Sequence, residues 1–159
     1  MKKLTAALLM ILMFAFPGVR LFADDEAPAE KTLFERLGGQ PAVEAVIGEF
    51  VARAAADPKV NFIRTGQPRT FDPTPENLEK LKKHLVQFVS VATGAQDVVY
   101  EGQDMKTAHE GMKITNAEFD AIAADLIGAL DKFNVPEKEK SELMAIVGTT
   151  RGQIVEEKS

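Results

Sequence analysis

The sequence predicts an all-α domain, and three observations lead to this prediction. From position 32 onward, apolar residues recur at steps of three and four, the period of a helix that buries one face. Two capping boxes, "TLFE" at 32–35 and "TNAE" at 115–118, mark helix starts. No stretch of useful length alternates apolar and polar residues, as a half-buried strand would. We therefore expect about five to seven helices of unequal length rather than an up-down bundle of equal ones.

The first two predicted helices are separated by a pair of glycines. The helix that opens at Thr32 should be short, because Gly38 and Gly39 end it. Pro41 suits the first turn of the next helix. Asp57-Pro58 ends that second helix. One apolar stripe follows the helical period along it: Val43, Val46, Ile47, Phe50, Val51 and Ala54.

The middle of the domain combines an irregular segment with a long helix. Residues 59–74 contain one glycine and two prolines, which exclude a long element, and their large apolar side chains favour folding back over the domain. Thr74-Pro75 opens a helix that is expected to run to about Thr93, where Gly94 can end it. His84 lies on the border of its apolar stripe, which consists of Leu78, Leu81, Leu85, Phe88, Val89 and Ala92.

Three further helices are expected in the second half. Met105, His109 and Met112 share one face of a short helix at spacing i, i+4, i+7, and Gly111 weakens that helix near its end. The capping box at 115–118 opens the clearest helix of the chain, and Pro136 opens the last one. Their stripes are Phe119, Ile122, Ala123, Leu126, Ile127, Leu130 and Phe133, then Leu143, Ile146, Val147 and Ile154.

The N-terminus has the pattern of a secretory signal peptide. Lys2 and Lys3 precede the apolar run "LTAALLMILMFAFPGV", and a small residue, Ala23, stands at the end of the segment, so residues 1–23 are expected to be removed after Ala23. The run is short for a membrane span, although an uncleaved anchor is the alternative. Residues 24–31 form a polar leader, and residues 32–159 form the domain. We therefore expect a periplasmic or secreted protein without stable membrane association.

Composition and charge exclude several function classes. The chain has no cysteine, which excludes disulfides, a thiol nucleophile and covalent haem attachment through CxxCH. Without residues 1–23, 16 basic residues face 24 acidic ones, a net charge of −8 that argues against nucleic-acid binding. No glycine-rich phosphate loop, HExxH pair or EF-hand occurs, and no catalytic residues are assigned.

The two histidines are the remaining candidates for chemistry. His84 and His109 lie on different predicted helices, and both border apolar stripes. Neutral imidazole is a good axial ligand for haem iron, and a porphyrin needs flat apolar walls of the kind these stripes supply. The alternative for each histidine is a partly buried, hydrogen-bonded residue, and the methionines beside His109 are also common core residues.

Several ordered pieces of the chain resemble the group 1 truncated haemoglobins. They are "LFERLGGQPAVEAVIGEFVARAAADPKV", "LKKHLVQFVSVATGA", "YEGQDMKTAHEGMKITNAEFDAIAADLIGAL" and "VPEKEKSELMAIVG", which together span about residues 32–155. The resemblance implies a two-over-two helical globin fold and non-covalent haem b, with His109 as the proximal iron ligand. It implies reversible binding and transport of dioxygen, and binding of nitric oxide or carbon monoxide as further ligands.

The distal side departs from that family in ways that bear on ligand binding. Many members carry Tyr where this chain has Val51 and Gln where it has Leu85, and those polar groups hydrogen-bond to bound dioxygen. We therefore do not expect strong dioxygen retention. Some members have a histidine at the position of His84 that binds the iron as a sixth ligand. For His84 we favour direct ligation over a place at the haem edge beside a propionate.

The resemblance also yields a predicted haem pocket and a set of alternative functions. Lys80, Lys83 and Arg64 are candidate propionate partners, though each could be solvated surface. The alternatives are a nitric oxide dioxygenase supported by an unknown reductase, a haem-based redox, electron-transfer or sensor protein, and a haem-free helical module. The predicted pocket, beside the two histidines, consists of Phe50, Val51, Phe62, Leu81, Leu85, Phe88, Met105, Met112, Ile114 and Phe119.

Overall fold

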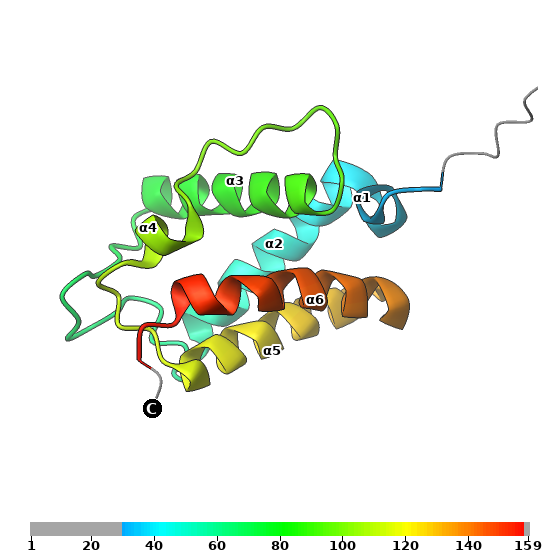
Figure 1. Ribbon diagram of the computed structural model, residues 1–159. Coiled ribbons are helices and arrows are strands. Elements are labelled where there is room, and N and C mark those ends of the chain that lie inside the picture. The colour runs from blue at the N-terminus through cyan, green and yellow to red at the C-terminus, as the bar shows by residue number, and fades with distance from the viewer. Residues whose placement is uncertain (1–29, 158–159) are drawn as a thin grey trace, which may run out of the picture.

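The computed structural model describes residues 30–157 and confirms the all-α class (Figure 1). The extended pairing within this range is a single bridge between Thr115 and Glu157. The predicted signal peptide lies outside the described residues, as does most of the leader, so the boundaries at 23 and 31 stay predictions. The helices are α1 (Leu33–Leu37), α2 (Gly39–Ala56), α3 (Pro75–Ala92), α4 (Met105–His109), α5 (Asn116–Lys132) and α6 (Glu137–Ile154).

The four long helices form two layers, which confirms the two-over-two prediction. In one layer α2 packs on α3, and in the other α5 packs on α6. Contacts between α2 and α5 join the layers, while the short α1 and α4 both pack against α6. Figure 1 shows α3 on one side of the molecule and the α5–α6 pair on the other. Among residues 30–157, we find no helix with the length and hydropathy that a membrane crossing requires.

The core centres on α2, which packs against α3 in its own layer and against α5 in the other. Its predicted apolar stripe is buried except for Phe50, which is half-buried, and side chains from α1, α3, α5 and α6 complete the cluster. An apolar cavity of about 190 Å³ lies within this core. The buried cluster consists of Leu33, Val43, Val46, Ile47, Val51, Val89, Leu126, Ala129, Leu130 and Leu143.

The predicted helix starts are confirmed by their hydrogen bonds. The hydroxyls of Thr32, Thr74 and Thr115 each accept a backbone N–H three residues ahead, at 3.2 Å in every case. Gly38 is required between α1 and α2, because its φ is +104° and a Cβ there would lie 2.9 Å from that of Ala42. Glycine at this position therefore allows α2 to start immediately after α1.

The prediction that Met105, His109 and Met112 share one face of a helix is wrong for Met112. The helix α4 ends at His109, and Met112 lies beyond it in a turn closed by the bond from Met112 N–H to the His109 carbonyl at 3.0 Å. Glu110, with φ −56° and ψ 129°, leaves the helical conformation, and Gly111 follows with φ +79° in the turn. Met105 and Met112 therefore have helical spacing in the sequence, but they do not lie on one helix.

The capping box of α5 contains a carboxylate whose protonation should change stability. Glu118 accepts the Thr115 N–H at 2.8 Å and pairs with Arg64 at 2.7 Å. Burial alone would raise the pKa of Glu118, but the bonds from Thr115 and Arg64 lower it below its ordinary value of 4.5. A carboxylate whose pKa is lowered by folding stabilises the fold above its unfolded-state pKa, and this contribution is lost as pH falls through the folded-state value.

Glu118→Gln should therefore lower the free energy of unfolding by about 1–3 kcal/mol near neutral pH, the usual cost of losing hydrogen bonds to a charged group. The difference from the wild type should shrink as pH falls from 4.5 through the lower folded-state pKa, below which the wild-type carboxylate is also neutral. Urea unfolding of both proteins across this range measures the difference. A difference that stays constant with pH would contradict the assignment.

Candidate functional site

The apolar face of α3 is only partly covered by protein. This helix is the most amphipathic of the four long ones, yet its buried residues are only Val89 and Ser90. Leu81, Leu85 and Phe88 remain half-buried. The helix packs on α2 and makes no extensive contact with α4, α5 or α6. A long apolar face that protein covers only in part is suited to covering a flat apolar ligand.

The apolar side chains of the segment around α4 are also only partly covered by protein. None of its five residues is buried, although Met105 and His109 are half-buried, as are Met112 and Ile114 beyond the helix. Both segments that carry a histidine are therefore segments with incompletely buried apolar side chains. Such surface is costly to leave in water, and burying it under a ligand would contribute favourably to binding.

The imidazole of His109 is prepared to act as a metal ligand. Its Nδ1 lies 2.7 Å from the carbonyl oxygen of Met105. Because a carbonyl can only accept, Nδ1 carries the proton and Nε2 of the neutral ring keeps its lone pair. Within residues 30–157, no hydrogen bond to Nε2 is found. Burial lowers the pKa of His109 despite the bond to Met105, which favours the neutral form that binds metals.

His84 lies against an aromatic residue that the sequence analysis did not single out. The ring of Tyr100 meets those of His84 and Phe88 edge to face, with centroids 6.3 and 5.8 Å apart. The Tyr100 hydroxyl donates to the Gln103 carbonyl at 2.8 Å, which fixes the tyrosine. Tyr100 is the only tyrosine of the chain and lies between the two predicted helices that carry the histidines. Its position in the sequence could therefore have indicated it as a candidate site residue.

The connection from α3 to α4 runs back along α3 and carries Tyr100 (Figure 1). Glu101 fixes it to the helix, accepting from Lys83 at 2.6 Å and from Gln87 at 3.1 Å. The bond from Lys83 contributes most to lowering the pKa of Glu101, so the carboxylate stays charged at neutral pH. These contacts position Tyr100 beside His84.

The structure divides the predicted pocket residues into two groups. Val51 and Phe119 are almost fully buried, at 4% and 3% exposure, and the Phe119 ring lies under the guanidinium of Arg151 at 4.2 Å. The others are half-buried, and four of them, Phe50, Phe62, Leu85 and Phe88, pack against the core. The ring of Phe62 also meets Phe71 edge to face at 5.4 Å. Their role as a haem pocket stays a prediction.

One predicted propionate partner is wrong. Arg64 is 4% exposed, and its guanidinium is committed to Glu118 and to the carbonyls of Met112 and Lys113. All three guanidinium nitrogens are engaged within the domain, and the buried side chain does not reach the surface where a propionate would lie. Lys83 is exposed and paired with Glu101, and Lys80 is exposed.

These residues fit a haem group. His109 offers a free Nε2 lone pair in a partly buried, neutral ring, and the segments around both histidines offer apolar surface that protein does not cover. Together they define a helical haem-protein site, with His109 as the candidate axial ligand and His84 as a second candidate.

Comparison with known proteins identifies the class. The bacterial-like globin family matches residues 32–156, so the chain belongs to this family, whose members bind haem. It is 30% identical over 123 residues to a group 1 truncated haemoglobin of Mycolicibacterium paratuberculosis, covering 77% of this chain and 83% of that protein. It is 31% identical over 122 residues to one from Tetrahymena thermophila, covering 77% and 93%.

Solved structures agree with the sequence relatives. The Fe(III) form of the truncated haemoglobin from Tetrahymena pyriformis superposes with a TM-score of 0.68 at 26% identity, covering 79% of this chain and 98% of that one. The two-over-two haemoglobin from Synechococcus, in a cyanomet state with covalently attached haem, gives 0.65 at 30% identity, covering 80% and 100%. The protein is therefore a haem-binding globin of the truncated, two-over-two type.

Proposed function

We propose that this globin holds haem b non-covalently through Nε2 of His109 and binds dioxygen reversibly, with nitric oxide and carbon monoxide as further ligands. The observation that carries the proposal is the His109 ring, which is neutral, oriented by Met105 and free at Nε2. When bound, haem supplies an iron with a coordination position at which a diatomic molecule can bind.

The chain's own residues have separate roles in this proposal. His109 anchors the iron, and its Nδ1–H bond to Met105 fixes the direction of the ring. The half-buried apolar side chains of α3 and of the segment around α4 exclude water from the site, which slows oxidation of the iron. Val51 and Leu85 carry no hydrogen-bond donor, so they offer a bound ligand no polar stabilisation.

His84 is proposed as a sixth ligand that leaves the iron when a diatomic molecule binds. Its half-buried place on α3, the helix whose apolar face is incompletely covered, supports this role. Tyr100 offers the displaced ring an edge-to-face contact, of a kind worth about 0.5–1.5 kcal/mol beyond area burial. A protein ligand on both sides of the iron would also suit electron transfer or redox sensing.

Optical spectra of the purified chain, reconstituted with haemin, test the proposal. We expect a Soret band in the ferric and ferrous forms, and a ferrous spectrum that changes in air and returns when dioxygen is removed. A colourless chain in excess haemin would favour a haem-free helical module instead. Immediate conversion to the ferric form in air would contradict reversible dioxygen binding.

Nitric oxide dioxygenation is the second candidate activity at the same site. In that reaction dioxygen and nitric oxide combine to nitrate while the iron loses one electron, so a reductant must restore it. The apolar Val51 and Leu85 weigh against it, because they leave bound dioxygen without a donor. Stopped-flow mixing of the oxygenated protein with nitric oxide distinguishes the two activities. Rapid conversion to the ferric spectrum with nitrate release would establish the dioxygenase.

Export to the periplasm or beyond is also proposed, on the basis of the signal pattern of residues 1–23. A chain exported unfolded must acquire its haem outside the cytoplasm. Cell fractionation and mass spectrometry of the mature protein test this point. The expected N-terminus is Asp24, whereas an intact N-terminus in the membrane fraction would favour the anchor.

A further inference from the structure

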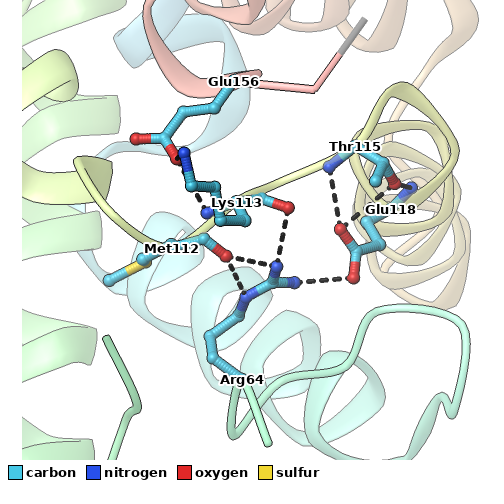
Figure 2. Close-up of polar contacts among 6 residues, drawn as sticks. All are labelled: Arg64, Met112, Lys113, Thr115, Glu118 and Glu156. Carbon is cyan, nitrogen blue, oxygen red and sulfur yellow. Dashed lines mark hydrogen bonds and ion pairs between the residues drawn. The ribbon is translucent and has the colours of Figure 1, made fainter. Parts of the chain in front are cut away.

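We propose that Arg64 and Glu156 form a clamp that positions His109 toward the haem iron. The two side chains hold the backbone of residues 111–113, which begin two residues after His109 (Figure 2). This inference rests on the proposed role of His109 as the iron ligand. It assigns Arg64 and Glu156 as positioning residues.

Arg64 holds the carbonyl side of this segment. Its Nε donates to the Met112 carbonyl at 2.9 Å, a bond that Nη2 shares, and Nη2 also donates to the Lys113 carbonyl at 3.0 Å. Nη1 donates to Glu118 at 2.7 Å, so all three guanidinium nitrogens are engaged. The backbone of Arg64 has φ +61°, an uncommon conformation for a residue other than glycine. Its side-chain bonds offset the cost of that conformation.

Glu156 holds the amide side from the C-terminal end of the domain. Its two carboxylate oxygens accept the N–H groups of Gly111 at 2.6 Å and of Lys113 at 2.9 Å. The Glu156 N–H in turn donates to the Ile114 carbonyl at 3.0 Å. Figure 2 shows Arg64 and Glu156 reaching this segment from different parts of the chain. Two side chains of opposite charge therefore fix the donors and acceptors of one short stretch of backbone.

The helix that carries His109 needs such support. It has five residues and none of them is buried, and a single turn of helix is not stable alone. Arg69, from the same irregular segment as Arg64, donates to the Thr107 carbonyl at 3.0 Å. The backbone on both sides of His109 is therefore hydrogen-bonded to side chains from residues 59–74. The Nδ1 bond to Met105 orients the ring only relative to its own helix. The clamp sets where that helix lies.

The orientation of an axial imidazole affects how firmly the metal is held, and loss of the groups that orient such a ligand typically costs about 10- to 100-fold in metal affinity. If the clamp orients the imidazole, breaking it should change the iron–imidazole bond. If the clamp only stabilises the fold, breaking it should lower the melting temperature and leave that bond unchanged. The two roles can therefore be separated by measurement.

The test compares Arg64→Met and Glu156→Gln with matched controls in the haem-reconstituted protein. Arg53→Met removes another arginine–glutamate pair, with Glu49 at 2.9 Å on α2, and Glu157→Gln changes the exposed neighbour of Glu156. The readouts are the rate of haem transfer to excess apomyoglobin, the iron–imidazole stretching band in resonance Raman spectra, and thermal unfolding of the apoprotein. The Raman spectra are recorded in a His84→Ala background, so that His109 is the one proposed protein ligand.

We expect both clamp variants to lose haem about 10- to 100-fold faster than the wild type and to shift the stretching band, while both controls match the wild type. Glu156 is exposed, so Glu156→Gln keeps the test decisive even where Arg64→Met unfolds. Wild-type haem loss and an unmoved band in Glu156→Gln would overturn the clamp and leave the proposed function intact. A wild-type chain without a Soret band would overturn the proposed function, and the clamp with it.

Discussion

Replacing His109 with alanine should abolish tight haem binding while leaving the apoprotein folded. The imidazole is the one group in this part of the site with a free, neutral nitrogen oriented by a backbone bond, at 2.7 Å from the Met105 carbonyl. Removing it deletes the proposed bond to iron, so the loss should exceed the about 10- to 100-fold typical of changes in groups that only orient a ligand. A titration with haemin, followed at the Soret band, measures the affinity.

Two controls separate ligand loss from unfolding. Circular dichroism of the apoprotein should match the wild type, because His109 lies at the end of a short helix without buried residues. His109→Gly with free imidazole should recover the Soret spectrum, because the small molecule can occupy the space of the missing ring. A His109→Ala chain that binds haemin as tightly as the wild type would refute the assignment of the proximal ligand.

Local chemistry explains why much of the fold could be predicted from the sequence. The starts at Thr32, Thr74 and Thr115 follow from side chains that cap their own helices within three residues. The stripe on α2 is buried because α2 packs against both α3 and α5. Such features depend on near neighbours in the chain, which a sequence displays directly.

Contacts between distant parts of the chain could not be predicted in the same way. Arg64 looked like a surface charge within an irregular segment, yet 48 residues separate it from Met112, whose carbonyl it binds. Glu156 binds Gly111 across 45 residues, and nothing in the local pattern around either residue indicates the pairing. The end of α4 was misjudged because Met112 continues the helical spacing, although the helix ends at His109 and Glu110 already has a non-helical ψ of 129°.

The same difference between local features and long-range contacts applies to the candidate site. The sequence and its family resemblance indicated both histidines, and the ring of His109 has the free nitrogen that ligation requires. The place of Tyr100 beside His84 depends on how the connection from α3 folds back, held by Glu101 bonds to Lys83 and Gln87. Only the folded chain brings these groups together, so the environment of His84 was not accessible from spacing.

His84→Ala should convert a six-coordinate haem spectrum into a five-coordinate one. In the proposed function His84 occupies the position that a diatomic ligand must take, so the apparent affinity for that ligand is reduced by the fraction of protein in which His84 has left the iron. If that fraction is about one tenth, the substitution should raise the apparent affinity and the binding rate of carbon monoxide about tenfold. Flash photolysis of the carbon monoxide complex measures the rate, and optical spectra report the coordination.

Tyr100→Leu provides the matched comparison, because it keeps His84 and removes its edge-to-face partner, whose ring centroid lies 6.3 Å away. If Tyr100 holds the displaced ring, its loss should favour the six-coordinate form and slow carbon monoxide binding, opposite in sign to His84→Ala. The contact contributes about 0.5–1.5 kcal/mol, so this effect should be the smaller one. An unchanged spectrum and rate in His84→Ala would remove His84 from the iron and place it at the haem edge, where Tyr100→Leu should have no effect on coordination.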